Sequence, residues 1–337
     1  VLALLGNDVV LDPDASTIGT GDFFVEMAGS CSGIEGFALT AGFFVIYSVL
    51  MRDTIKLGLF WGIVFPVALL VSWIFNVVRI AGLILIGANV SPDLAVNGFH
   101  SFAGWLFFTL LALGVLWVVQ AMPSLHRVPT RRNQDAPPLT DDPAAAFIIP
   151  FIVFMISGLF TQTFWQNPVL AYPLQVVMMA ITLWIFRKPF LHLDWRPDLM
   201  AVGAGVLVGG GWLVMAPAGA AQPDLSRLGA GALVAWSMCR VIGTTFLVPV
   251  IEEAFFRGYL LRWLDGHHRM RTVLAVTVSS LAFAMLHGRL IEAGLAGVIF
   301  ALIALRRGRV TDAIVAHAVA NGLIAIAAGT SANWSLI

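Results

Sequence analysis

Apolar stretches separated by short polar ones follow one another along almost the whole chain. A helix needs about 20 apolar residues to cross the hydrocarbon core of a bilayer. The predicted spans lie at residues 34–51, 57–75 (extending towards 88), 99–121, 147–165, 169–186, 199–216, 229–264, 272–287, 290–305 and 311–329. No alternating strand pattern competes with them, and membranes admit only helices or closed barrels. We therefore predict an all-α fold, a polytopic transmembrane helical bundle.

One segment breaks the apolar pattern. Residues 122–146, "MPSLHRVPTRRNQDAPPLTDDPAAA", are rich in proline, charged and small residues, which is typical of a linker. We predict two helical blocks, at 1–121 and 147–337, joined by this linker on the cytoplasmic side.

Composition and charge agree with a membrane protein. Hydrophobic residues make up 59% of the chain and charged residues only 11%, against about 25% charged in a soluble domain. The formal net charge is zero, so nothing suggests nucleic-acid binding. If the spans alternate, most basic residues fall on one side of the bilayer, which the positive-inside rule makes cytoplasmic.

The run "VPVIEEAFFRGYLLRW" places Glu252, Glu253 and Arg257 inside an apolar segment. An ionised carboxylate at the bilayer centre costs on the order of 2.5–3.5 kcal/mol. Arg257 follows Glu253 by four residues, so a helix puts the two on one face and offsets part of that cost. Glu252 has no such partner, and a desolvated carboxylate beside a second negative charge suits a general base. The sequence gives no reason for Arg240, which also lies in an apolar run.

Two further polar patterns follow in later helices. "FAMLH" ends on His287, and "HAVAN" places His317 and Asn321 one helical turn apart. Glu252 with His287 could activate water, and His317 with Asn321 could hold a developing oxyanion. A structural Glu253–Arg257 pair and a packing role for His287 remain open. The zinc spacing HExxH is absent, so we expect no metal and no cofactor.

The ordered motifs EExxxR, FxxxH and HxxxN resemble the CAAX-protease and bacteriocin-processing family of intramembrane proteases, over about residues 147–329. "FFRGYL" matches as well. The resemblance implies a glutamate-dependent, metal-independent protease. In it Glu252 activates water with help from His287, Glu253 supports Arg257, and His317 and Asn321 stabilise the oxyanion.

The N-terminal block places three reactive residue types at one membrane face. Cys31 precedes the first span, Arg79 lies near the outer end of the second, and His100 near the outer start of the third. A cysteine nucleophile needs a base, which His100 could be, and a cation at the carbonyl oxygen, which Arg79 could supply. Packing of Cys31, interfacial anchoring by Arg79 and helix capping by His100 are the structural alternatives.

The elements "CSGI", "NVVRI" and "HSFAGW" resemble the exosortase family over about residues 20–121. The resemblance implies a Cys31–Arg79–His100 triad. It also implies membrane-bound protein substrates whose C-terminus carries a short motif, a hydrophobic helix and a basic tail. The two blocks together resemble the exosortase E/protease fusion, which is associated with a VPEID-type signal. Because more helices precede the cysteine there and this chain opens on Val1, we expect N-terminal helices to be missing from it.

The predicted protein is a multi-pass enzyme of the bacterial inner membrane, a cysteine transpeptidase or protease fused to a glutamate-dependent intramembrane protease. A non-enzymatic transporter or immunity-type membrane protein is the alternative, because buried ionisable residues also mark ion pathways. The interrupted, inverted helix pair of many transporters is not seen in the sequence.

Overall fold

The computed structural model describes residues 1–6, 8–26, 33–127, 138–196, 198–217, 219–266 and 268–337. It divides the chain into two compact units. Unit 1 comprises Val1–Ala136 and Gly158–Pro168, and unit 2 comprises Pro137–Ser157 and Val169–Ile337. Of the predicted linker, residues 128–137 lie outside the described part, and the first helix after it begins at Pro143.

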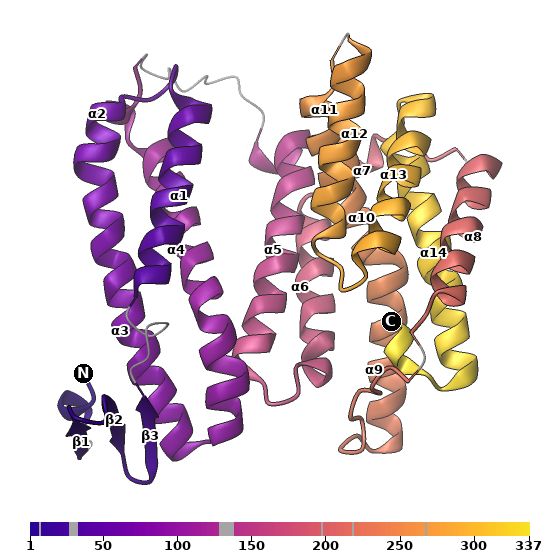
Figure 1. Cartoon of the computed structure of the whole chain (residues 1–337). Helices are drawn as coiled ribbons and strands as arrows, with labels where there is room; N and C mark the ends of the chain where they lie inside the picture. Colours follow the sequence, from indigo (N-terminus) through magenta and orange to yellow (C-terminus); the bar gives the residue numbers. More distant parts are fainter. Residues whose placement is uncertain (7, 27–32, 128–137, 197, 218, 267) are drawn as a thin grey trace. The chain divides into compact units, whose positions relative to one another are not determined.

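Unit 1 consists of long helices and one small sheet (Figure 1). Its elements are β1 (Val9–Asp12), β2 (Thr17–Thr20), β3 (Phe23–Glu26), α1 (Ile34–Met51), α2 (Leu57–Leu59), α3 (Phe65–Asn89) and α4 (Ser101–Ala121), with the end of α5 (Pro143–Phe164). A wide π-helical turn, Phe60–Val64, joins α2 to α3, and a second one, Leu94–His100, leads into α4. Rings such as Phe44 and Phe60, stacked with centroids 4.5 Å apart, fill the core between α1 and the turn that leads into α3.

The antiparallel sheet β1–β2–β3 was not predicted from the sequence. Its turns explain it: the Asp12 carboxylate accepts the backbone N–H groups of Asp14 and Ala15, which closes the β1–β2 connection. Gly21, at φ 59°, supplies the left-handed residue that a two-residue hairpin needs between β2 and β3. The strands are short and rich in turn-forming residues, so their sequence pattern is much weaker than that of the apolar helices that follow.

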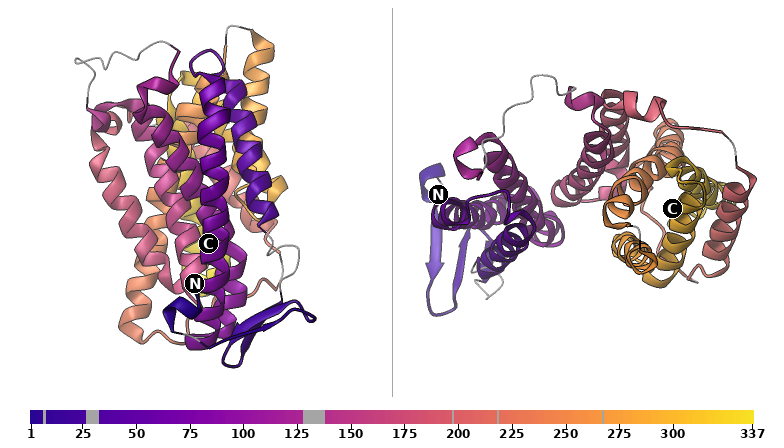
Figure 2. Two further views of the ribbon diagram at one scale, coloured as in Figure 1. Left: turned by 90° about the vertical axis from the view of Figure 1, so that its left-hand side faces the viewer. Right: turned by 90° about the horizontal axis from the view of Figure 1, so that it is seen from above.

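Helices are the only regular secondary structure among the described residues of unit 2. Its elements are the start of α5, α6 (Tyr172–Ile185), α7 (Arg187–Leu191), α8 (Leu199–Val214), α9 (Ala230–Ile242), α10 (Val248–Glu253), α11 (Leu261–Leu264), α12 (Arg269–Ala284), α13 (Leu290–Arg307) and α14 (Val310–Ser331). The π-helical turns Gly243–Leu247 and Ala254–Leu260 join α9, α10 and α11 into one continuous helix. Seen from above, α14 lies between α8 and the helices α10–α13 (Figure 2).

Close backbone packing fixes α14 against α8. A Cβ atom at Gly205 would lie 2.4 Å from the carbonyl oxygen of Ala316, and one at Gly209 would lie 2.8 Å from that of Ala320. Only glycine fits at these two positions, four residues apart, as in the small-residue interfaces of membrane helices. The motif helix α14 is thereby held at backbone distance from its neighbour.

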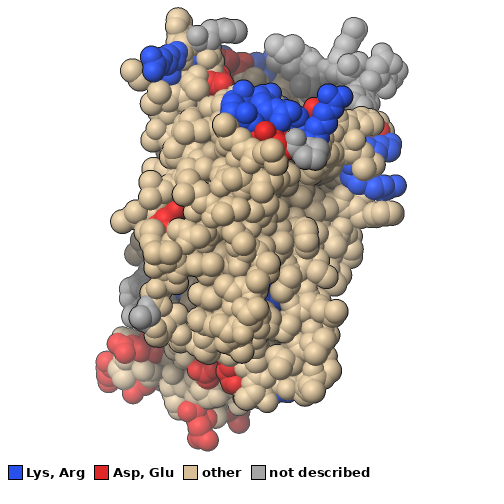
Figure 3. Space-filling model, turned by 90° about the vertical axis from the view of Figure 1, so that its right-hand side faces the viewer, with Lys and Arg blue, Asp and Glu red and all other residues tan. Residues whose placement is uncertain are grey.

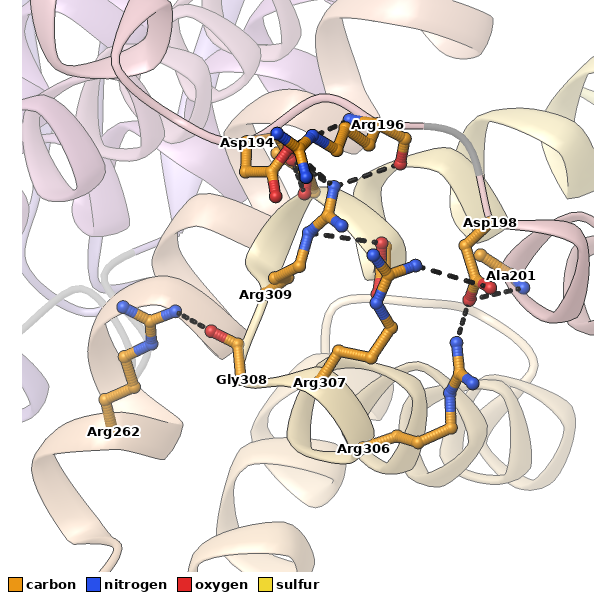
Figure 4. A network of polar contacts seen from close by, with 11 residues as sticks. Asp194, Arg196, Asp198, Ala201, Arg262, Arg306, Arg307, Gly308 and Arg309 are labelled. Atoms are coloured by element: carbon orange, nitrogen blue, oxygen red, sulfur yellow. Dashed lines mark hydrogen bonds and ion pairs between the residues drawn. The ribbon is translucent and has the colours of Figure 1, made fainter.

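A network of arginine and aspartate side chains ties helix ends together at one end of unit 2 (Figure 4). Asp198 caps α8 and forms ion pairs with Arg306 and Arg307 at the end of α13. Arg309 pairs with Asp194 at 3.2 Å and donates to the carbonyl of Arg196. We call this the arginine-rich end. In Figure 3 the basic side chains gather here, above a wide band of the surface with almost no charge.

Seven helices within the described residues are long and apolar enough to span a membrane, which confirms the predicted polytopic bundle. Three predicted spans form helices that fall short of this measure. Helices α8 and α12 have only 16 residues each, and α13 carries Glu292, Arg306 and Arg307 in its 18 residues. Figure 1 shows the connection between α12 and α13 at about half the height of unit 2.

Candidate functional site

The long helix α9–α11 carries the acidic pair at its most buried point. The exposed fractions of Glu252, Glu253 and Arg257 are 3%, 0% and 1%. Both glutamates end α10, and Arg257 lies in the wide turn that follows. Such π-helical turns occur frequently at functional sites.

Arg257 is held by the Glu253 carboxylate on its own helix. Its Nε atom lies 3.1 Å from Oε2 of Glu253, and Nη1 donates to Oε1 at 3.1 Å. Nη2 donates to the carbonyl oxygen of Gly297 on α13 at 2.9 Å, and the guanidinium lies 4.5 Å from the ring centre of Phe283. A buried ion pair needs such additional partners to offset its desolvation.

His317 of α14 contacts the same carboxylate. Its Nδ1 atom lies 2.9 Å from Oε1 of Glu253. Because a carboxylate that binds Arg257 accepts, Nδ1 is the donor, and Nε2 is the ring atom left for a substrate. The Phe300 ring stacks on the imidazole with centroids 4.9 Å apart, which fixes the plane of the ring.

Glu252 differs from its neighbour although both are buried. Its Oε2 atom makes no hydrogen bond with any residue that the structure describes. The charges of His317, Glu253 and Arg257 all act on its carboxyl group. A buried carboxyl oxygen without a hydrogen-bond partner is costly for stability.

His287 lies in the connection after α12. Its Nδ1 atom is 2.9 Å from the carbonyl oxygen of Phe283. A carbonyl only accepts, so Nδ1 carries the proton and Nε2 is free to accept one. The ring is 4.5 Å from that of Phe283, which in turn lies 5.7 Å from the ring of His317. Phe283 therefore lies between the two histidines.

Asn321 has a contact that the motif alone did not predict. Its Nδ2 atom donates to the carbonyl oxygen of Thr244 at 2.8 Å. In the π-helical turn each N–H bonds the carbonyl five residues earlier, as Val248 does with Gly243. Pro249 has no N–H to give Thr244, and Asn321 supplies the missing donor. One of its two amide protons is thus used structurally.

The structure explains two residues, Arg240 and Gly297, to which the sequence alone assigned no role. The Arg240 guanidinium lies 4.2 Å from the ring centre of Tyr172, a cation–π contact that accounts for a charge in an apolar run. Gly297 leaves the space for Arg257, because a Cβ atom there would lie 3.3 Å from Nη2 and 3.1 Å from Cα of Ser280. No sequence signal singled out Gly297.

In unit 1, the structure brings Arg79 and His100 together. Nη2 of Arg79 donates to the backbone carbonyl of His100 at 2.9 Å. Gly104 lies beside the guanidinium, and a Cβ atom there would be in ordinary van der Waals contact with Nη1 at 3.5 Å. Cys31, the predicted nucleophile, lies outside the described residues.

A cavity of about 70 Å³ adjoins Arg79. Arg79, Glu35, Asn76 and Ser101 contribute its polar lining. Glu35 and Arg79 are also the charged groups that act on His100. Glu35 was not predicted as a site residue, although an acidic residue in the first turn of the predicted span, four residues after Cys31, was a usable signal.

Among the described residues there is no group of three or more histidine, cysteine, aspartate or glutamate side chains that could hold a metal ion. The structure thus defines a multi-pass membrane protein with a buried Glu–Arg–His network in unit 2 and an Arg–His pair in unit 1.

The family comparisons agree with this division. Residues 1–117 match the model of the transmembrane exosortase family, and residues 234–323 match that of the type II CAAX prenyl endopeptidase Rce1-like family. The chain therefore joins an exosortase-like part to a CAAX-protease-like part in the predicted order, and both matches support a membrane peptidase. No curated protein and no solved structure gives a significant match.

Proposed function

We propose that the chain is a two-site peptidase of the bacterial inner membrane. One site cleaves the C-terminal sorting signal of exported proteins with Cys31, and the other hydrolyses peptide bonds within the membrane with Glu252. The observation that carries the proposal is the buried Glu253–Arg257–His317 network, next to a second buried carboxyl group whose Oε2 atom has no hydrogen-bond partner among the described residues.

At the glutamate site, Glu252 takes a proton from water and the resulting hydroxide attacks the substrate carbonyl carbon. His287 supports this step through its free Nε2 atom. His317, held by Glu253, donates to the oxyanion from Nε2 when the ring carries a second proton, and Asn321 does so from its remaining amide proton. The C–N bond then breaks as the proton passes to the leaving amine.

At the cysteine site, the thiolate of Cys31 attacks the carbonyl carbon next to the sorting motif. Arg79 stabilises the oxyanion, and His100 gives a proton to the amine that leaves. The thioester passes to an acceptor nucleophile or to water. The substrates are membrane-bound proteins with a motif, a hydrophobic helix and a basic tail, and the glutamate site removes the tail that this cleavage releases.

The two sites are tested separately with a reporter protein that carries such a tail. Cys31→Ala should leave the reporter at full length. Glu252→Gln should allow cleavage at the motif while the released tail peptide accumulates, as detected by mass spectrometry. Full processing by Cys31→Ala, or an unchanged tail peptide level with Glu252→Gln, would contradict the respective assignment.

A further inference from the structure

A second cavity lies at the end of unit 2 opposite the arginine-rich end. It has a volume of about 450 Å³, within the range of ligand pockets. Ala220 and Gln222, which follow α8, and Asn333 and Ser335, which follow α14, contribute to its wall. Both helices begin at the arginine-rich end, so the residues beyond their last turns lie at the other end.

His287 and Gly288 also line this cavity. They lie in the α12–α13 connection, which reaches only about half the height of unit 2 (Figure 1). The cavity lies against this connection, and His287 is one of its lining residues. The cavity therefore extends from one end of unit 2 to a residue of the proposed hydrolytic site.

The wall of the cavity is mixed, with more apolar than polar surface, and has almost no net charge. Arg289 is its one charged lining residue among those described, and its guanidinium is paired with Glu292 at 3.1 Å and lies 4.3 Å from the ring centre of Trp212. The other polar lining groups are His287, the amides of Gln222 and Asn333 and the hydroxyl of Ser335, and the last three are hydrogen-bonded to one another. Their remaining donors and acceptors match the N–H and C=O groups of a peptide backbone.

We propose that this cavity is the entrance through which an uncharged, extended peptide segment of a membrane-bound substrate reaches His287 from the non-cytoplasmic side. The side follows from the positive-inside rule, which places the arginine-rich end in the cytoplasm. The inference rests on the proposed function for its substrate class. The cavity's side and accessibility can be measured without any activity.

Cysteine labelling tests the side. Gly288→Cys is introduced into a chain with Cys31→Ser and Cys239→Ser, since a side chain at Gly288 meets nothing within 4 Å. A membrane-impermeant maleimide should label it in right-side-out spheroplasts and not in inverted vesicles. Ala220→Trp, which fills the cavity, should abolish labelling, whereas the matched change Ala221→Trp outside the lining should leave it unchanged. Labelling from inverted vesicles alone, or equal labelling with both tryptophans, would overturn the proposal.

Protection by peptides tests the occupant. A capped hexapeptide of alternating leucine and serine, at about ten times its dissociation constant, should slow labelling of Gly288→Cys roughly tenfold by occupancy. The same peptide with glutamate in place of serine should protect much less. Equal protection by both peptides, or by neither, would overturn the assignment of an uncharged segment. If labelling and protection hold while Glu252→Gln has no effect on proteolysis, the entrance stands and the proposed hydrolysis fails.

Discussion

Nδ1 of His317 lies 2.9 Å from the Glu253 oxygen that also accepts from Arg257. One carboxylate thus connects α10 with α14 and orients a histidine while it compensates a buried cation. In the proposed function Glu253 is therefore a positioning residue, and its neighbour Glu252 is the general base.

Replacement of Glu253 by Gln should destabilise the protein, because Arg257 stays buried without its counter-charge. The expected loss is about 3–5 kcal/mol, measured by denaturant unfolding in detergent. The double change Glu253→Leu with Arg257→Met removes both charges and should recover most of this stability without recovering activity. A single variant as stable as the wild type would contradict the role of the ion pair.

Replacement of Glu252 by Gln should leave stability close to that of the wild type, because the side chain keeps its shape and its Oε2 atom has no hydrogen bond among the described residues to lose. Loss of a general base should lower tail-peptide hydrolysis by a factor of about 10²–10⁴. A variant that hydrolyses the peptide at the wild-type rate would exclude Glu252 as the base.

Replacement of Asn321 by Ala should leave the partly buried carbonyl of Thr244 without its donor and cost about 1–3 kcal/mol in unfolding free energy. Pro249→Ala restores a backbone N–H at the position that lacks one, so the double variant should be more stable than Asn321→Ala. If Asn321 also stabilises the oxyanion, the double variant stays inactive. Full recovery of hydrolysis would show that Asn321 acts only on the helix.

A side chain larger than hydrogen at Gly297 should displace Arg257. Gly297→Val should therefore reduce both stability and hydrolysis, because its Cβ atom would meet Ser280 at 3.1 Å and the guanidinium at 3.3 Å. Gly294→Val on the same helix is the control, since its Cβ atom would lie 3.8 Å from that of Ala284. Equal thermal stability of the two variants would argue against a space requirement at Gly297.

Acid should weaken the network at the arginine-rich end. Burial opposes ionisation of Asp198, but the hydrogen bond from Arg306 and the charges of Arg306 and Arg307 outweigh it and lower the pKa of Asp198 below 3.8. The ionised Asp198 therefore contributes to the stability of the folded protein above pH 3.8, and this contribution is lost as the pH falls below that value. Asp198→Asn should unfold more easily at neutral pH and show a shallower acid dependence. Asp53→Asn, at an exposed ion pair, should change neither.

Much of the architecture follows from the apolar pattern. Predicted spans such as 34–51 and 229–264 agree with the observed helices within one residue, because length and hydropathy alone determine them. The pairing of Glu253 with Arg257 followed from helical spacing. The contact between Glu253 and His317 could not be predicted in this way. The two residues are 64 positions apart in the sequence, and only the packing of α14 brings them together. Gly205 and Gly209, which make that packing possible, give no signal when the partner helix is unknown.

The shortness of α12 has a consequence for the surrounding lipid. Sixteen residues span about 24 Å, less than the roughly 30 Å thickness of the hydrocarbon layer. The bilayer beside the hairpin must become locally thinner to match it. The free-energy cost of this thinning grows with the length of the lipid acyl chains. Reconstitution in phospholipids of increasing acyl length should therefore slow the glutamate-dependent reaction, so that the thickness of the host bilayer itself becomes a determinant of turnover.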